Sequence, residues 1–302
     1  MYHEERKARF IEESGRSVGY CKKFFQDAQP IEEEYGLDLA QLPSEAVRTL
    51  LLKQVRTRVI ALNIATGFIR EYYQWCSENG YEVGDGLSDL NIDLSEVVRR
   101  SMVSSPMHLA MVLDAMFDPL EKGSADCLYR CYCWLAFSGI PQGHIFDVRI
   151  GDMDFYHMIV CLDGHMYDMY RESVPTILDC CWKSHFLYEN QNYTEKEMMR
   201  PRHKGDYLMR SIRADRITIR AVQNRLPRAN ARAGTDLNYT GLYLSGVFYR
   251  AYELERAGFQ PDFASVALEK LTAEGKPIKR TTITSAVRAF LEDYENWKKA
   301  YG

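Results

Sequence analysis

Ten basic side chains crowd into one segment of the chain, residues 200–232, and their type and spacing suit the binding of phosphates. The same segment holds only two acids, Asp206 and Asp215, so its formal charge is +8. Because the whole chain has a charge of −4, all other residues together sum to −12. Lysine and arginine bind phosphates and release condensed counterions, and a cluster of this density is typical of that interaction. The segment therefore predicts a polyanionic partner, with a solvated helix face that meets acidic neighbours in the fold as the alternative. The ten side chains are those of Arg200, Arg202, Lys204, Arg210, Arg213, Arg216, Arg220, Arg225, Arg228 and Arg232.

The middle of this segment, residues 217–226, has helical periodicity. Arg213, Arg216 and Arg220 follow three- and four-residue spacing, so on a continuous helix they would share one stripe along a DNA groove. Neutral polar side chains among them can read base edges while arginines hold the register. If the apolar residues of the helix face a core instead, the helix is simply amphipathic and basic. The predicted DNA contacts of this segment are Arg210, Arg213, Arg216, Thr218, Arg220, Gln223, Asn224, Arg225 and Arg228.

A second basic set lies in the first eighty residues and could contact the opposite side of a DNA duplex. Its members are Arg48, Lys53, Arg56, Arg58 and Arg70. Of these, Arg56, Arg58 and Arg70 are the predicted DNA contacts. The alternative is that these charges serve only the solubility of helix surfaces.

The apolar pattern predicts a mainly helical chain with one small antiparallel sheet. Helical spacing recurs through residues 44–55 and 58–79, and again in residues 95–120 and 124–137. The dipeptide Asp163-Gly164 separates two short apolar segments, which predicts a β-hairpin because both turn positions favour positive φ. Further helices are expected over residues 241–254 and 284–301. Glycines and acids in residues 84–94 indicate a linker, so the predicted domains are residues 1–83 and 95–302.

Composition excludes several classes of protein. With 302 residues and 46% apolar content, the chain can bury a real core and is not a disordered tail. The longest apolar run, residues 131–137, is far shorter than the ~18–20 residues of a membrane span. A charged start, with no apolar stretch after it, gives no sign of secretion. The chain is therefore interpreted as cytoplasmic.

The eight cysteines and the histidines near them raise the question of a metal site. Cys127, Cys131 and Cys133 lie in an apolar stretch, and Cys180 and Cys181 are adjacent. None of these spacings is the paired C-x2-C that places two thiolates on one tetrahedral ion. We therefore expect core packing, with no metal and no cofactor. We also expect the aromatic side chains near residue 132 to pack in the core, and the alternative is that they stack on nucleic-acid bases.

The order of these parts resembles the tyrosine recombinases of the phage integrase family. Residues 31–39 (Ile-Glu-Glu-Glu-Tyr-Gly-Leu-Asp-Leu) and 69–80 (Ile-Arg-Glu-Tyr-Tyr-Gln-Trp-Cys-Ser-Glu-Asn-Gly) are similar to the family's helical, DNA-clamping core-binding domain. Leu-Ala-Phe-Ser-Gly-Ile at residues 135–140, and the stretch at residues 145–154, are similar to the catalytic-arginine turn and first strand of integrase catalytic domains. Leu-Tyr-Leu-Ser-Gly-Val-Phe at residues 242–248 falls where those domains have a His-x-x-Arg box. The resemblance implies a SAM-like core-binding domain followed by an integrase-type domain with a C-terminal tail helix.

The residues that the family uses for chemistry are replaced in this sequence. In the family, two arginines hold the scissile phosphate, a lysine and a histidine manage protons, and a tyrosine attacks phosphorus. Pro141-Gln142-Gly143 stands at the place of the first arginine, Tyr243 or Leu244 at that of the second, and the hairpin has no lysine. Each lost arginine removes several kcal/mol of transition-state stabilisation, so losing both predicts no useful strand cleavage. Arg149 and Arg250 stay open as substitutes. The remaining tyrosines of the last helix, and thus the weak candidates for the nucleophile, are Tyr294 and Tyr301.

The predicted function is that of a double-stranded-DNA-binding protein with an integrase-like fold and a silenced active site. It would act as a regulator, such as a repressor, or as an accessory factor of a phage or mobile element. One alternative is an active site-specific recombinase with a rearranged pocket, and another is a module whose basic segment binds an acidic protein. The last helix, residues 284–301, could dock on a neighbour in a homo-oligomer or pack on its own domain.

Overall fold

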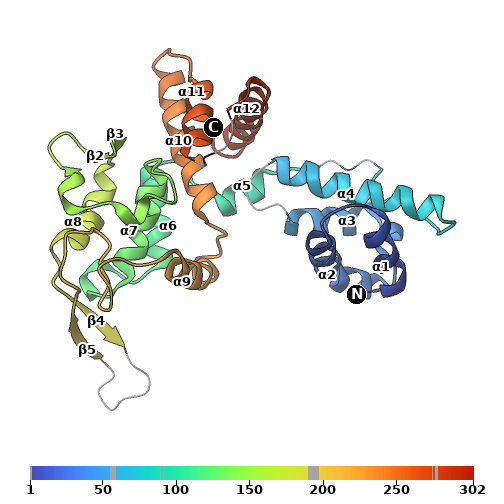
Figure 1. Ribbon diagram of the computed structural model, residues 1–302, viewed down its shortest axis with the longest axis horizontal. Coiled ribbons are helices and arrows are strands. Elements are labelled where there is room, and N and C mark those ends of the chain that lie inside the picture. Colours follow the sequence, from blue (N-terminus) through green and yellow to red (C-terminus); the bar gives the residue numbers. More distant parts are fainter. Residues whose placement is uncertain are drawn as a thin grey trace. The chain divides into compact units, whose positions relative to one another are not determined.

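Helices form most of the two compact units into which the chain divides, Met1–Val97 and Val98–Gly302 (Figure 1). The computed structural model describes residues 2–54, 59–88, 90, 92–189, 197–273, 275 and 278–302. The strands form two small antiparallel sheets, one of three strands and one of two. The predicted fold class, mainly helical with a small antiparallel sheet, is confirmed.

The first unit is made of helices joined by short turns. Gly36 ends α2 in the left-handed conformation, with a φ of 64° that favours glycine, and the chain then turns into a short 3-10 helix. Proline 43 precedes α3, which begins at Ser44 as the sequence predicts. The elements are α1 (Glu4–Glu13), α2 (Val18–Tyr35), η1 (Leu39–Gln41), α3 (Ser44–Gln54) and α4 (Val59–Glu78).

Aromatic rings fill the core of this unit. The ring of Phe10 meets those of Phe25, Phe68 and Tyr72 edge-on, with centroids 6.0, 5.7 and 5.0 Å apart. Such T-shaped contacts add stabilisation beyond the burial of area alone. The predicted linker, residues 84–94, belongs to this unit, because Leu87 and other apolar side chains from it pack against the same core.

The second unit begins within α5 and is built around α7. Eleven of the twelve residues of α7 are buried, with Tyr129 as the exception, so the helix is enclosed on nearly all sides. The helices and 3-10 helices of this unit are α5 (Ser95–Ser101), α6 (Pro106–Met116), η2 (Leu120–Lys122), α7 (Asp126–Phe137), η3 (Ile145–Asp147), η4 (Ile150–Asp152), η5 (Arg171–Ser173), α8 (Val174–Trp182), α9 (Ile219–Ala233), α10 (Tyr239–Arg256), α11 (Phe263–Ala273) and α12 (Arg280–Tyr301). Its strands are β1 (Met153–Asp154), β2 (Ile159–Leu162), β3 (His165–Asp168), β4 (His185–Glu189) and β5 (Glu197–Pro201).

Cysteines contribute to the cores as predicted. Seven of the eight are buried, and only Cys161 on β2 is exposed. Burial raises the pKa of the Cys133 thiol to about 12, so this group stays protonated at neutral pH. These thiols therefore act as small apolar side chains.

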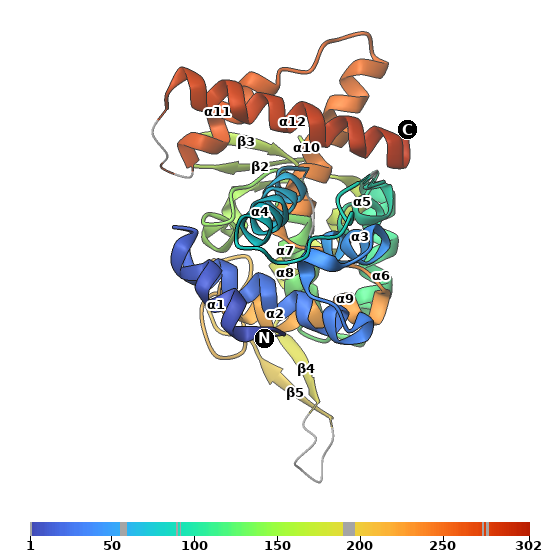
Figure 2. The same cartoon turned by 90° about the vertical axis from the view of Figure 1, so that its right-hand side faces the viewer.

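The predicted hairpin is confirmed. Strands β2 and β3 pair with Val160 opposite Tyr167, and the turn residues Asp163 and Gly164 have φ of 51° and 80°. The first strand, expected within residues 145–154, occupies only Met153–Asp154 (β1), because η3 and η4 take up most of the residues before it. A second hairpin, β4–β5, projects from the unit and was not predicted (Figure 2).

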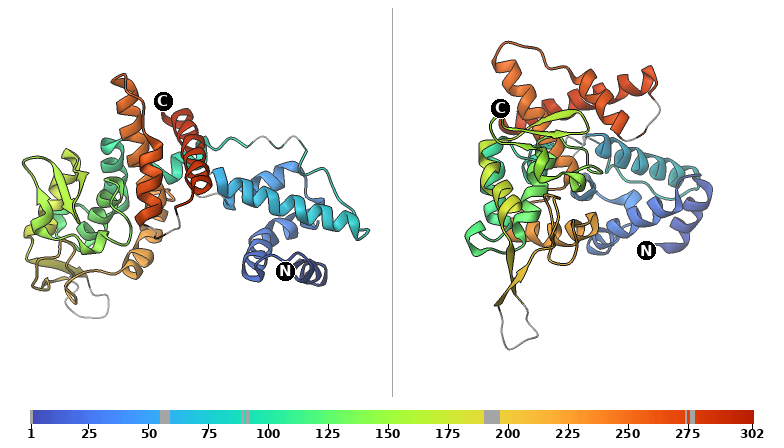
Figure 3. Two further views of the ribbon diagram at one scale, coloured as in Figure 1. Left: turned by 45° about the horizontal axis from the view of Figure 1, so that its top comes forward. Right: turned by 60° about the vertical axis from the view of Figure 1, so that its left-hand side comes forward.

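The C-terminal helices form a second core within this unit. Helices α11 and α12 lie side by side (Figure 3). Phe290, Tyr294 and Trp297 of α12 are buried with residues of α10 and α11. The indole nitrogen of Trp297 donates to the carbonyl oxygen of Val103 at 3.0 Å. The sequence left open whether the last helix docks on a neighbouring copy or packs on its own domain. In this structure α12 packs on its own unit. Each helix in the described part of the chain is too short or too polar for a bilayer crossing.

Candidate functional site

Helix α9 presents a polar stripe to solvent and buries its opposite face. Arg220, Gln223, Asn224 and Arg228 are exposed at positions i, i+3, i+4 and i+8, and we call these four residues the α9 stripe. The buried side of the helix comprises Val222, Leu226 and Ala229. The apolar residues thus face a core, as in the predicted alternative, and this orientation leaves the α9 stripe in water.

The helix begins later than a continuous arginine stripe requires. Helix α9 starts at Ile219, and the Thr218 hydroxyl caps it by accepting the N–H of Ala221. Upstream, the hydroxyl of Ser211 accepts the N–H groups of residues 213 and 214, which holds the chain in a tight turn. The prediction that Arg213, Arg216 and Arg220 share one helical stripe is therefore wrong.

Three predicted or nearby arginines are joined to carboxylates within the unit. The pairs are Arg225 with Asp126, Arg216 with Asp147, and Arg232 with Asp118. The first is bidentate, with Nε and Nη2 of Arg225 lying 3.0 and 2.6 Å from the two carboxylate oxygens of Asp126. Because that carboxylate is 7% exposed, Arg225 anchors α9 to the start of α7.

Two further arginines of the basic segment bind backbone carbonyls. Arg202 is 7% exposed and donates to the carbonyl oxygens of five residues, among them Cys180 at 2.8 Å and Leu208 at 3.1 Å. Burial lowers its pKa. Arg210 donates to the carbonyl oxygens of Gly205 and Cys181. These two side chains fasten the loops before α9. This role could not be predicted, because backbone carbonyl acceptors leave no pattern of residue types in the sequence.

The cations that stay exposed form a smaller group than the sequence suggested. Within the described residues, four basic side chains of the segment are exposed and have no carboxylate partner: Lys204, Arg213, Arg220 and Arg228. Two of them belong to the α9 stripe. In the first unit, Arg48 and Lys53 on α3 and Arg70 on α4 are exposed, whereas Arg56 and Arg58 lie outside the described residues.

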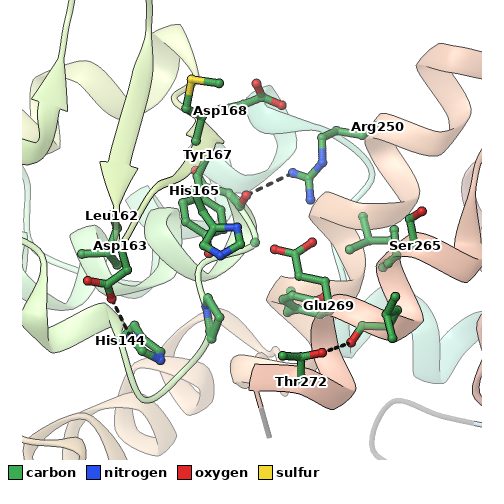
Figure 4. A pocket seen from close by; sticks show the side chains of 18 residues that line it. His144, Leu162, Asp163, His165, Tyr167, Asp168, Arg250, Ser265, Glu269 and Thr272 are labelled. Atoms are coloured by element: carbon green, nitrogen blue, oxygen red, sulfur yellow. Dashed lines mark hydrogen bonds and ion pairs between the residues drawn. The ribbon is translucent and has the colours of Figure 1, made fainter. Parts of the chain in front are cut away.

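A pocket of about 730 Å³ lies in the second unit, between the β2–β3 hairpin and helices α10 and α11 (Figure 4). It unites three segments that the resemblance assigns to a catalytic site: the turn after α7, the hairpin, and the stretch 242–248 of α10. Pro141 and Tyr243 stand in its wall, at two of the positions where the resemblance expects arginine. The lining residues are Ser138, Gly139, Pro141, His144, Leu162, Asp163, His165, Met166, Tyr167, Asp168, Tyr243, Val247, Arg250, Ser265, Val266, Leu268, Glu269 and Thr272.

One arginine lines this pocket, and its guanidinium is already engaged. Nη1 of Arg250 lies 3.3 Å from the carbonyl oxygens of Phe137 and Ser138, and 3.2 Å from the hydroxyl of Tyr170. It therefore stabilises the C-terminal end of α7, where a positive charge is favourable. Arg149, the other proposed substitute, is not part of the lining and instead pairs with Asp206 at 2.7 Å.

Acidic groups outnumber the cation in the pocket lining. Among the described lining residues, Asp163, Asp168 and Glu269 are acidic and Arg250 is basic, which gives them a formal charge of −2 when histidine is counted as neutral. Asp163 lies 3.3 Å from Nδ1 of His144. Glu269 comes from α11, a helix that the sequence did not predict. This carboxylate was therefore absent from the candidate residues.

The two candidate nucleophiles lie in the C-terminal core. Tyr294 is 1% exposed, and its hydroxyl donates to Oε2 of Glu255 at 2.9 Å. The hydroxyl of Tyr301 donates to the carbonyl oxygen of Met102 at 2.7 Å. Burial raises the pKa of both, in Tyr301 to about 12, and in Tyr294 the acceptor Glu255 raises it further. Neither residue lines the pocket.

Known proteins resemble the chain at two levels. Residues 1–78 match a family model described as MrpR, N-terminal core-binding domain, which confirms the core-binding domain predicted at this end. Among solved structures, the XerA recombinase is similar with 16% identity and a TM-score of 0.38, over 94% of this chain and 96% of that one. The Tn1549 transposon integrase, in complex with circular intermediate DNA, is similar with 13% identity and a TM-score of 0.37, over 95% of this chain and 98% of its own. No curated protein matches.

Proposed function

We propose that this protein binds double-stranded DNA as an integrase-type clamp without cutting it. The observation that supports this proposal most is the α9 stripe, in which two arginines without a carboxylate partner among the described residues flank two neutral amides. Arginine contacts to phosphates give affinity, and amides can bond base edges, most simply those of adenine. The core-binding match of residues 1–78 supports the same function for the first unit, with Arg48, Lys53, Arg56, Arg58 and Arg70 as candidate contacts.

We infer from the charge of the pocket that the protein does not cleave DNA strands. A phosphoryl transition state spreads negative charge over its oxygens and needs preorganised cations around it. The lining described above is acidic, and its single guanidinium is committed to carbonyl oxygens of α7. A scissile phosphate would therefore be repelled.

DNA binding without cleavage suits a regulator, such as a repressor, or an accessory factor of a phage or other mobile element. Arg210, Arg216 and Arg225 enter this proposal as positioning residues, because their guanidinium groups are bonded within the unit. Arg213, Arg220 and Arg228 are then the contacts to phosphate, and Thr218 is the cap that sets where α9 begins.

Replacing Arg220 and Arg228 together by alanine tests the α9 stripe. Each phosphate contact on duplex DNA contributes roughly 0.9 to the slope of log K against log salt. We expect the double variant to bind weakly and to lower that slope by about two units. The measurement is fluorescence anisotropy of a labelled duplex over a series of salt concentrations.

The matched control removes the same charge elsewhere in the unit. Arg256 at the end of α10 and Arg280 at the start of α12 are exposed and lie outside the basic segment. Alanine at both should leave the slope nearly unchanged. If the control weakens binding as much as the α9 variant does, the field of the whole unit and not the α9 stripe is responsible.

A further inference from the structure

The pocket between the β2–β3 hairpin and α11 has the dimensions of a small-molecule site. Its volume of about 730 Å³ falls within the roughly 300–1,000 Å³ of typical ligand pockets. Leu162, Val247 and Val266 supply apolar wall, and Tyr167 supplies an aromatic one. Such a cavity, apolar with a few convergent polar groups, is the usual form of a ligand site.

The polar groups that converge on this cavity favour a cation. Figure 4 shows the carboxylate of Glu269 and the ring of His165 directed into the space between the hairpin and α11. Neither Glu269 nor Asp168 forms a salt bridge within the described residues. Tyr167 of β3 lines the same cavity, so the pocket holds this carboxylate and an aromatic ring together (Figure 4).

Among the described residues, the cations near this pocket have contacts elsewhere. Arg250 is bonded to carbonyl oxygens of α7, and Lys270 lines a smaller pocket with its ammonium 5.4 Å from the centre of the Tyr243 ring. A carboxylate beside an aromatic ring attracts an ammonium group both by charge and by the negative face of the ring.

We propose that this pocket binds a small organic amine, with its ammonium between Glu269 and Tyr167 and its apolar body against Leu162, Val247 and Val266. The proposal concerns a ligand distinct from DNA and does not depend on the α9 stripe. The proposed ligand is positively charged, whereas the phosphate of a DNA substrate is negatively charged.

Phenethylamine and phenylacetate form a matched pair of probes, because both have a phenyl ring and differ in the sign of their charge. Isothermal titration calorimetry of the full chain should show binding of phenethylamine at millimolar concentration and none of phenylacetate. The Glu269→Gln variant should bind phenethylamine at least about tenfold more weakly, because it loses a charge-assisted contact. Asp168→Asn should weaken binding in the same direction.

Glu292→Gln is the matched control, since this exposed carboxylate of α12 lies outside the pocket. It should leave the affinity for phenethylamine unchanged. Glu269 is itself exposed, so its variant should retain the unfolding temperature of the parent chain, which a thermal scan verifies. Equal binding of phenylacetate, full binding by Glu269→Gln, or no heat from phenethylamine would each overturn the proposal.

Discussion

At the scale of single residues, several charged side chains of this protein hold the fold together from buried positions. The clearest example is Lys7, whose ammonium and the carboxylate of Glu32 are both fully buried and bonded to each other. Burial lowers the pKa of Lys7 and raises that of Glu32, while their mutual attraction opposes both changes. Glu32 also accepts the N–H of Leu39 at 2.7 Å, so the pair ties α1 and α2 to the following turn.

Lys7→Met should destabilise the first unit strongly. The substitution leaves the Glu32 carboxylate buried without its cation, which typically costs 3–5 kcal/mol, roughly, in the free energy of unfolding. Urea denaturation followed by fluorescence measures the change. Adding Glu32→Gln should recover part of the loss, because the amide oxygen still accepts the Leu39 N–H. The exposed pair Lys23–Asp27 provides the control, and Lys23→Met should cost about 1 kcal/mol or less.

Residue pairs of this kind mark the limit of what the sequence could predict about the site. The basic segment and the neutral side chains of α9 were recognised from spacing alone. That Arg225 pairs with Asp126, 99 residues away, could not be recognised, since long-range partners leave no local pattern. The exposed part of the basic segment is therefore smaller than its formal charge suggests.

At the scale of elements, close backbone approach decides how α10 meets α7. A Cβ at Gly246 would lie 1.7 Å from the carbonyl oxygen of Phe137, which is backbone and cannot rotate away. The absence of a side chain at this position lets two buried helices touch. One turn further along α10, the Arg250 guanidinium donates to the carbonyl oxygens of Phe137 and Ser138 at the C-terminal end of α7.

Gly246→Ala should destabilise the second unit, because α10 must move away from α7 to admit the methyl group. Overpacking of a core usually costs about 1–3 kcal/mol and sometimes more. Gly67, inside α4, has no atom within 4 Å of its hypothetical Cβ, so Gly67→Ala should be neutral or stabilising by about 0.5–1 kcal/mol. Urea midpoints of both variants measure the contrast. Equal stability of the two variants would contradict the close contact.

Elements with strong local signals were predicted, and those without them were missed. The Asp-Gly turn placed the β2–β3 hairpin correctly because its backbone preference is local. The helix expected over residues 217–226 is present as α9, and it begins at Ile219 behind the Thr218 cap, so Arg213 and Arg216 lie outside it. Helix α11 and the β4–β5 hairpin were not predicted at all. The pocket depends on α11 for Glu269, which explains why the sequence identified only part of its lining.

At the scale of the whole molecule, formal charge is distributed unevenly along the chain. Residues 200–232 carry +8, and all other residues together sum to −12. The field of a basic cluster raises the local concentration of a polyanion. The proposed binding of duplex DNA is therefore expected to be strongest at the exposed part of the basic segment.

Binding without cleavage predicts that no covalent intermediate forms. The test uses genomic duplex fragments that the protein retains, synthesised again with a nick in one strand. On such a substrate an active recombinase would be trapped with its tyrosine linked covalently to a DNA phosphate. We expect denaturing gels to show no adduct, because the pocket lacks paired cations and the hydroxyls of Tyr294 and Tyr301 are bonded internally. An adduct that disappears in Tyr294→Phe or Tyr301→Phe would establish the active recombinase instead.

The bonds of α12 to the start of its own unit bear on how the protein is made. Trp297 and Tyr301 donate to the carbonyl oxygens of Val103 and Met102, and Arg99 donates to that of Ala300. The core of the first unit is complete once residue 97 has emerged from the ribosome, so that unit can fold during synthesis. The second unit must wait until Tyr301 has been made, about two hundred residues later, before its opening segment finds the partners that hold it. Chaperones therefore have the longest opportunity to act on this unit of the nascent polypeptide.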